Sequence, residues 1–214
     1  MFLSACLSQG DERRDVSMPV ASPSASVSSL PLIDDMAQAL LSFEPSAGRE
    51  DALRMYGQFV DAWDVDVIAY PPDKPPVRQR GEWIFSWALE GRAVQDVWIV
   101  PARSQRSQAG TGARPYGTTL RFPDASGSRW RIVWINPVSH SLFTMTASFQ
   151  NGEILQEGVD EEGHRFRWVF YEIEPDRFRW RAEDLADGRT WTLRQEMRVT
   201  RRPVPVSRRT WGAS

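Results

Sequence analysis

Cysteine and histidine are scarce in this chain of 214 residues. Its single cysteine, Cys6, has no second thiol to pair with, so intrachain disulfides and cysteine-rich metal sites are excluded. His140 and His164 each lie in or beside an expected turn, without a second kind of metal ligand at useful spacing. We interpret both as exposed turn residues and expect neither a metal site nor a cofactor. A haem iron, which needs only one histidine ligand, is the cofactor alternative that the sequence leaves open.

Excess charge of one sign and long apolar runs are also missing. The 26 lysine and arginine residues oppose 28 aspartate and glutamate residues, which gives a formal charge of −2. Such a balance provides no global field to recruit nucleic acid or an anionic membrane surface. No stretch approaches the roughly 18 to 20 apolar residues that a membrane-spanning helix needs. We expect no nucleic-acid partner and no membrane span.

Motifs for the common chemistries are absent as well. The chain has no G-x-S-x-G nucleophile elbow, no phosphate-binding P-loop, no G-x-G-x-x-G fingerprint and no H-E-x-x-H pair. Nucleophilic and nucleotide-dependent chemistry therefore have no support. Whether the protein is an enzyme stays open at this point.

The first residues allow two interpretations. Leu3-Ser4-Ala5-Cys6 resembles the lipobox of bacterial lipoproteins, in which the cysteine is acylated. A secretory signal needs a basic region and about 7 to 15 apolar residues before the cleavage site, and neither precedes Cys6. We therefore expect a cytoplasmic protein, with a lipid anchor through Cys6 as the alternative if the true start lies upstream. The Ser/Pro/Ala-rich composition before Leu32 predicts a disordered leader over 1–31, and 203–214 is expected to be a flexible tail.

Two short helices are expected over 32–56. Apolar residues from Leu32 to Phe43 follow helical spacing, and Pro45 would end that helix. A second helix is predicted over Glu50–Tyr56. In a barrel protein such segments cap one open end or pack on the outer wall; a lid over a ligand is the alternative.

From Phe59 onward the chain alternates extended runs with turn formers such as Asn-Gly and Asp-Gly. The connections are too short for crossover helices, so the sheet must be antiparallel with up-and-down order. The sequence therefore predicts an all-β, roughly ten-stranded antiparallel up-and-down barrel over 57–202. Only Arg103–Pro115 is a long loop, a candidate flap at the barrel mouth. The expected strands are Phe59–Tyr70, Val77–Leu89, Arg92–Ala102, Tyr116–Phe122, Arg129–Asn136, Ser141–Gln150, Glu153–Val159, His164–Ile173, Arg177–Leu185 and Trp191–Arg202.

The late strands show which faces are expected inside. Phe166, Trp168 and Phe170 alternate with arginines, and the same pattern recurs in the next two strands. Trp191 and Leu193 are expected on the same inward face as Met197, with the charged residues outside. We also expect Trp63 in the first strand to be covered by Arg194 or Arg198 of the last strand, in a cation–π contact that closes one end.

The stretch from about Gly57 to Arg202 resembles the calycin superfamily, specifically uncharacterised bacterial lipocalin-like proteins. The residues that carry the resemblance are Trp63, which opens the first strand, and Gly91-Arg92, which opens the third. The resemblance implies a barrel that encloses a small hydrophobic molecule. Relatives with this architecture include carriers as well as cofactor-free cyclases and isomerases, so it implies no particular substrate.

Three functions follow as expectations. The first is a binding module that holds a small hydrophobic or aromatic molecule; the second is a cofactor-independent isomerase or cyclase, with Asp96 or Glu82 as candidate catalytic carboxylates. The third is a packed structural barrel whose outer face forms a homodimer. The residues expected to line a ligand cavity are Trp83, Trp87, Gln95, Trp98, Trp134, Asn136, Trp168, Trp180 and Gln195.

Overall fold

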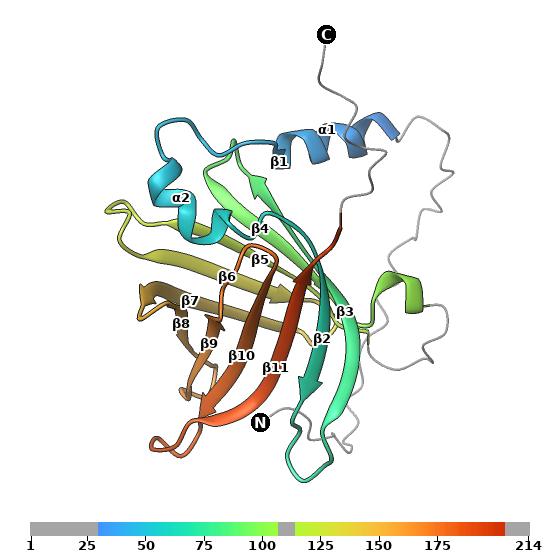
Figure 1. The fold of residues 1–214 in the computed structure, drawn as a ribbon, viewed down its shortest axis with the longest axis vertical. Helices are drawn as coiled ribbons and strands as arrows, with labels where there is room; N and C mark the ends of the chain where they lie inside the picture. The colour runs from blue at the N-terminus through green and yellow to red at the C-terminus, as the bar shows by residue number, and fades with distance from the viewer. Residues whose placement is uncertain (1–29, 107–113, 204–214) are drawn as a thin grey trace, which may run out of the picture.

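The computed structural model describes residues 30–106 and 114–203, and the predicted leader and tail lie almost wholly outside them (Figure 1). Ten antiparallel strands form a closed barrel, in which each strand pairs with the next and β11 returns to β2. The predicted all-β class and the up-and-down order are confirmed. The barrel strands are β2 Asp61–Ala69, β3 Val77–Ala88, β4 Ala93–Ile99, β5 Tyr116–Pro123, β6 Trp130–Asn136, β7 Ser141–Gln150, β8 Glu153–Val159, β9 Arg165–Tyr171, β10 Arg177–Leu185 and β11 Thr192–Arg201.

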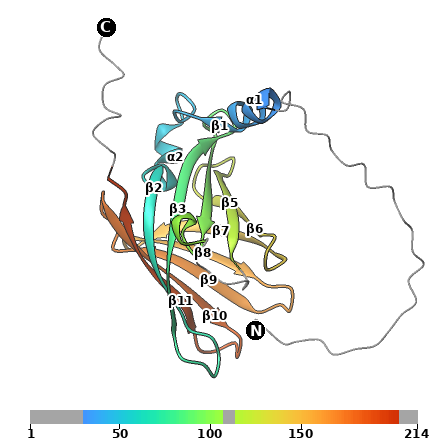
Figure 2. The ribbon, with the colours of Figure 1, turned by 90° about the vertical axis from the view of Figure 1, so that its right-hand side faces the viewer.

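The N-terminal extension contains helices α1 (Leu30–Leu40) and α2 (Glu50–Gly57). Helix α1 ends before the predicted Phe43 because the two-residue strand β1 (Leu41–Ser42) pairs with the end of β3. Figure 2 shows α1 outside the barrel, whereas α2 lies over one end. No helix of the described residues is long and apolar enough to span a bilayer.

Gly91 allows the segment between β1 and α2 to pass close to the β3–β4 turn. Its φ of +73° is in the region that favours glycine. A Cβ at this position would lie 2.3 Å from the carbonyl oxygen of Glu44, and Gly91 accepts a hydrogen bond from the Ser46 N–H at 3.0 Å. The glycine of the Gly91-Arg92 pair is therefore required by a close backbone approach.

Helix α2 closes its end of the barrel with aromatic packing. Tyr56 on the helix and Phe59 just after it are buried among the inward-facing rings of the strands. The Phe59 ring lies 4.7 Å from that of Phe178 and 5.1 Å from that of Phe170. Aromatic rings of successive strands thus converge on a common interior, as the alternation in the sequence predicts. We call the end of the barrel that α2 covers the closed end.

The prediction for Trp191 and Leu193 was wrong. A β-bulge shifts the β10–β11 register between Ala182 and Glu183, so that Leu193 pairs with outward-facing Glu183 whereas Met197 remains inside. Trp191 accordingly lies outside, with the Arg167 guanidinium 4.1 Å from its ring centre. A single extra residue thus reverses the faces in the first part of β11.

The arginine that covers Trp63 was also wrongly identified. Arg201 is the cross-strand neighbour of Trp63, and its guanidinium lies 4.1 Å from the ring centre. Arg198 instead lies on the outer face, where Asp66 is its cross-strand neighbour. Arg194 lies near the other end of β11, where it forms an ion pair with Asp184 at 2.9 Å.

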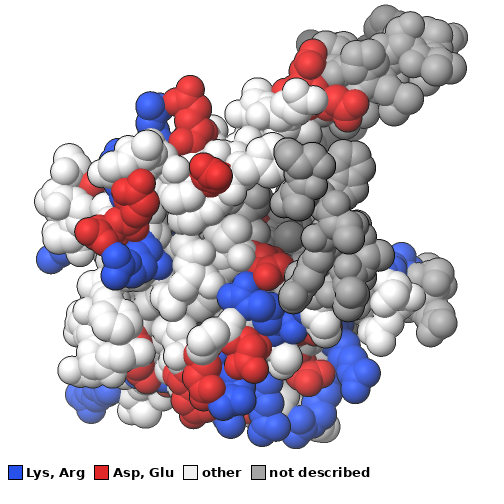
Figure 3. All heavy atoms as spheres, turned by 45° about the horizontal axis from the view of Figure 1, so that its top comes forward, with Lys and Arg blue, Asp and Glu red and all other residues white. Residues whose placement is uncertain are grey.

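The outer wall is ionic over a large part of its surface. Figure 3 shows basic and acidic side chains interleaved over the lower part of the molecule, where β10, β11, β2 and β3 lie. Cross-strand pairs such as Arg167 with Glu183 and Arg181 with Glu153 belong to this wall. Such exposed or half-exposed pairs are each worth about 0 to 1 kcal/mol, so the wall adds little to the stability of the barrel.

Candidate ligand-binding site

Four tryptophans form a row of contacts inside the barrel, towards the end away from α2. Trp98 of β4, Trp134 of β6, Trp168 of β9 and Trp180 of β10 contact one another in that order. Their ring centres are 6.1, 5.7 and 5.5 Å apart, with tilted or edge-to-face geometry. We call these four residues the aromatic collar. The collar brings together four of the residues that the sequence predicted for a cavity.

Burial differs sharply between the collar and the closed end. Trp63 and Phe170 have no exposed surface. Trp98, Trp134 and Trp168 face the interior too, yet each keeps part of its surface exposed. Phe143 beside Trp168 is likewise half-buried. The second end of the barrel is therefore open, and solvent reaches indole surface inside it.

One glycine makes room for a collar ring. Gly117 of β5 lies under Trp134, and a Cβ there would lie 2.3 Å from the indole. The ring can therefore lie against the barrel wall. The same wall would force the ring inward if residue 117 carried a side chain.

A buried polar network lies next to the collar, towards α2. Asp96 and Arg121 form an ion pair in which neither side chain has exposed surface. The Arg121 guanidinium lies 5.1 Å from the centre of the Tyr56 ring, and the Tyr56 hydroxyl accepts a hydrogen bond from Gln156 Nε2 at 2.7 Å. Burial is the largest influence on the Asp96 carboxyl and raises its pKa, while Arg121 acts in the opposite direction. Burial also raises the pKa of Tyr56.

The other residues predicted for the cavity lie elsewhere or deeper. Trp83 is buried beneath the collar, 6.2 Å from the Trp180 ring centre. Trp87 is inward-facing but lies at the closed end, where its ring packs on Gly57 of α2. Gln95 lies on the outer face of β4, opposite to that of Asp96, and its Nε2 donates to Thr118 Oγ1 at 3.0 Å.

The two remaining amides are at the open end. Gln195 follows the bulge in β11 and is half-buried on the inner face, opposite Ala182. Asn136 is buried, and its Oδ1 accepts the backbone N–H groups of Val138 and Ser139. Asn136 thus holds the β6–β7 turn, whereas the Gln195 side chain forms no hydrogen bond with the described residues.

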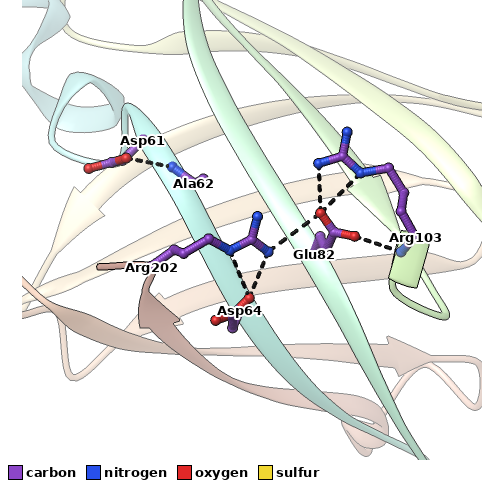
Figure 4. A network of polar contacts seen from close by, with 6 residues as sticks. All are labelled: Asp61, Ala62, Asp64, Glu82, Arg103 and Arg202. Atoms are coloured by element: carbon purple, nitrogen blue, oxygen red, sulfur yellow. Dashed lines mark hydrogen bonds and ion pairs between the residues drawn. The ribbon is translucent and has the colours of Figure 1, made fainter. Parts of the chain in front are cut away.

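The candidate catalytic carboxylates are both engaged by arginines. Glu82 lies on the outer face of β3, where its oxygens accept the backbone N–H and the guanidinium of Arg103 at 2.6 to 3.1 Å (Figure 4). Arg202 approaches Glu82 at 3.4 Å and also binds Asp64. Asp96 is inside the barrel but is paired with Arg121. Glu82 therefore fastens the segment after β4, and Asp96 holds a buried arginine.

Arg121 was not anticipated from the sequence. An arginine between apolar residues in a strand is ordinarily assigned to the solvent face. The only indication in the sequence was the position of Arg121 in the strand alternation, which places it on the same face as Gly117 and Thr119. Phase alone could not distinguish the inner from the outer face of β5.

His164 has two carboxylates beside it. One ligand atom each of Asp160, Glu162 and His164 lies within 4.8 Å of the others. The Asp160 side chain already accepts the backbone N–H groups of both other residues, at 3.1 and 2.7 Å. This arrangement is that of a turn stabilised by aspartate.

The best-formed hollows of the described chain lie outside the barrel. A groove of about 600 Å³ follows the outer wall of β11, β2 and β3. A smaller hollow of about 300 Å³ lies at the closed end beside Phe59 and Arg201. The collar rings pack on one another, so a ligand that lies between them would have to displace at least one ring.

Comparisons with known proteins identify the fold. No family model matches the chain, and no curated protein matches it. The crystal structure of Rv2717c from M. tuberculosis is similar with a TM-score of 0.51 and 13% identity, over 71% of this chain and 98% of that one. The S-type phycobiliprotein lyase CPES from Guillardia theta is similar with a TM-score of 0.50 and 6% identity, over 74% and 99%. The chain has a calycin-like β-barrel fold.

Proposed function

We propose that the open end of the barrel binds a small, neutral, largely aromatic molecule. The observation that supports this is the partial exposure of Trp98, Trp134 and Trp168, which face inward. Concave sites lined by aromatic residues with a few polar groups are the usual form of small-molecule sites. The ligand would stack on these indoles and reach the amide of Gln195.

The charges of the interior favour a neutral ligand. Arg121 is neutralised by Asp96, and Arg194 at the open end is neutralised by Asp184. No free cation of the described residues therefore faces the collar to balance a buried carboxylate. Burying an unpaired charge costs far more than burying a neutral group, so an anionic ligand would be excluded.

Entry of the ligand requires the collar to open. Trp168 and Trp134 meet at an interplanar angle of 83°, and rotation of either ring away from the other would create a slot between them. Stacking on the ligand would replace the packing between the two indoles. Aromatic pairs of this kind contribute about 0.5 to 1.5 kcal/mol, which a flat ligand can match.

Titration with N-phenylnaphthylamine, a neutral dye that becomes fluorescent in apolar surroundings, tests the proposal. Wild-type protein should give saturable binding with one site per chain. Trp168→Ala should weaken binding by about tenfold or more, because the dye would lose the indole on which it stacks. Trp191→Ala is the matched control, since Trp191 lies on the outer wall.

Ala182→Phe provides a second test that leaves no cavity behind. Ala182 is half-buried on the inner face at the open end, so a phenyl group there would occupy the proposed slot. We expect this variant to remain folded and to lose dye binding. Absence of saturable binding to wild type, or equal binding by wild type, Trp168→Ala and Ala182→Phe, would refute the proposal.

A further inference from the structure

The groove outside the barrel lies between two parts of the chain. One wall is the outer face of β11, β2 and β3, and the other is the segment that follows β4. The groove has a volume of about 600 Å³, within the range of small-molecule sites. Its charged lining residues are Asp66, Arg78, Arg80, Glu196 and Arg198.

The strand register arranges the charged residues of the groove in two rows. Arg198, Asp66 and Arg80 are direct cross-strand neighbours. In the next row, Glu196 lies opposite Ile68, which lies opposite Arg78. Three arginines therefore surround one apolar side chain, together with two carboxylates.

Both carboxylates have a polar partner, whereas two of the arginines have no hydrogen-bond or ion-pair partner among the described residues. Asp66 approaches Arg80 at 3.5 Å, and Glu196 accepts a hydrogen bond from the Tyr70 hydroxyl at 2.6 Å. Neither Arg78 nor Arg198 forms a hydrogen bond or an ion pair through its side chain with the residues that the structure describes. The charged residues that line the groove therefore carry a net positive charge, and two of their guanidinium groups make no hydrogen bond or ion pair within the described part of the chain.

The second wall is held in place by the buried Glu82. Its carboxylate binds both the backbone N–H and the side chain of Arg103, next to the wall residues (Figure 4). The Ala102 N–H donates to the Arg80 carbonyl at 3.0 Å, and the Gln105 N–H donates to the Ala102 carbonyl at 2.8 Å. These contacts fix the segment against β3, so the groove exists before any ligand binds.

We propose that this groove binds a small phosphate-bearing molecule. Guanidinium groups bind phosphate oxygens with paired, charge-assisted hydrogen bonds. A phosphate has enough oxygens to engage Arg78 and Arg198 together, whereas one carboxylate is satisfied by a single guanidinium. Ile68 and Pro101 supply apolar surface for the rest of the molecule. The site is separate from the aromatic collar and has the opposite preference for charge.

Calorimetric titration of the full chain with naphthyl phosphate at low ionic strength tests this inference. Arg78→Gln and Arg198→Gln should each weaken binding by about tenfold, because each removes charge-assisted hydrogen bonds. Asp66→Asn should strengthen binding by about threefold, since it removes a nearby negative charge and releases Arg80. Arg177→Gln, in an exposed ion pair with Glu174 elsewhere on the outer wall, should have no effect.

Several results would overturn the inference. Equal affinity of Arg78→Gln, Arg198→Gln and Arg177→Gln would show that the groove is not the site. Tighter binding of naphthoate than of naphthyl phosphate would show that the anion class is wrong. Competition with N-phenylnaphthylamine would place the phosphate compound in the barrel. Weaker binding of naphthyl phosphate to Arg78→Gln and Arg198→Gln than to Arg177→Gln supports the groove even if the dye itself does not bind.

Discussion

Arg121 and Asp96 form an ion pair inside the barrel, and neither side chain has any exposed surface. The pair lies beneath the Tyr56 ring of α2, with the guanidinium 5.1 Å from the ring centre. It therefore joins β4 and β5 to the helix that closes the barrel. A buried pair of this kind is costly to form and more costly to break.

Asp96→Ala should lower the free energy of unfolding by about 3 to 5 kcal/mol, because it leaves the Arg121 charge buried without a partner. The double variant Asp96→Leu/Arg121→Met should recover most of this loss, since apolar residues of similar volume replace both charges. Urea unfolding followed by circular dichroism measures both. A double variant less stable than Asp96→Ala would contradict this account of the pair.

Tyr56→Phe should lower the free energy of unfolding by about 1 to 3 kcal/mol. The change removes the hydroxyl that accepts the Gln156 amide, and the amide stays buried without that partner. Tyr70→Phe is the control, because the Tyr70 hydroxyl donates to Glu196 at the surface. Equal losses of unfolding free energy in the two variants would show that the buried hydrogen bond contributes no more to stability than the one at the surface.

The pH dependence of stability should reveal the contribution of the Glu82 carboxylate to the stability of the fold. Burial alone would raise the pKa of Glu82, but hydrogen bonds from Arg103 outweigh it and hold that pKa below its usual 4.5. Because the pKa is lower in the folded chain, the carboxylate stabilises the fold above about pH 4.5 and loses this contribution as the pH falls through the folded pKa. Glu82→Gln should therefore flatten the acid limb of the stability curve.

The control for Glu82 is Glu157→Gln, which alters an exposed pair with Arg165 on the outer wall. This variant should reproduce the wild-type acid limb in thermal unfolding between neutral pH and acid. If Glu82→Gln and wild type lost stability in parallel as the pH fell, the structural role of Glu82 would be wrong.

Arg201→Lys should destabilise the closed end by about 1 to 3 kcal/mol. The guanidinium covers Trp63 and also donates to Asp61 at 2.8 Å and to the carbonyls of Pro175 and Gln58. An ammonium group cannot make these contacts at once. Arg198→Lys, at an unpaired arginine on the same strand, should change stability by less than about 0.5 kcal/mol. Similar losses in the two variants would contradict the role of Arg201 in covering Trp63.

The strand pattern of the barrel was readable from the sequence because alternation and turn residues agree. The bounds of Ser141–Gln150, Glu153–Val159 and Arg177–Leu185 coincide with the predicted ones. Asn151 and Gly152 both have positive φ in the turn between the first two of these strands, as an Asn-Gly hairpin requires. Local chemistry therefore determines this part of the fold.

The errors came from features that depend on neighbouring strands. The bulge opposite Ala182 and Glu183 reverses the face of Trp191, and no residue in β11 marks it. Arg201, not Arg198, covers Trp63 because pairing between β11 and β2 sets which arginine is opposite. Arg121 is buried because Asp96 of the adjacent strand neutralises it. Register and charge pairing across strands cannot be derived from alternation alone.

Fluorine NMR of protein labelled with fluorotryptophan can show whether the aromatic collar is a binding site. Signals would be assigned by single Trp→Phe substitutions and followed during titration with N-phenylnaphthylamine. We expect saturable shifts for Trp98, Trp134 and Trp168, with Trp63 and Trp191 unchanged. Shifts confined to Trp191, or no shift of any collar residue under saturating dye, would contradict it.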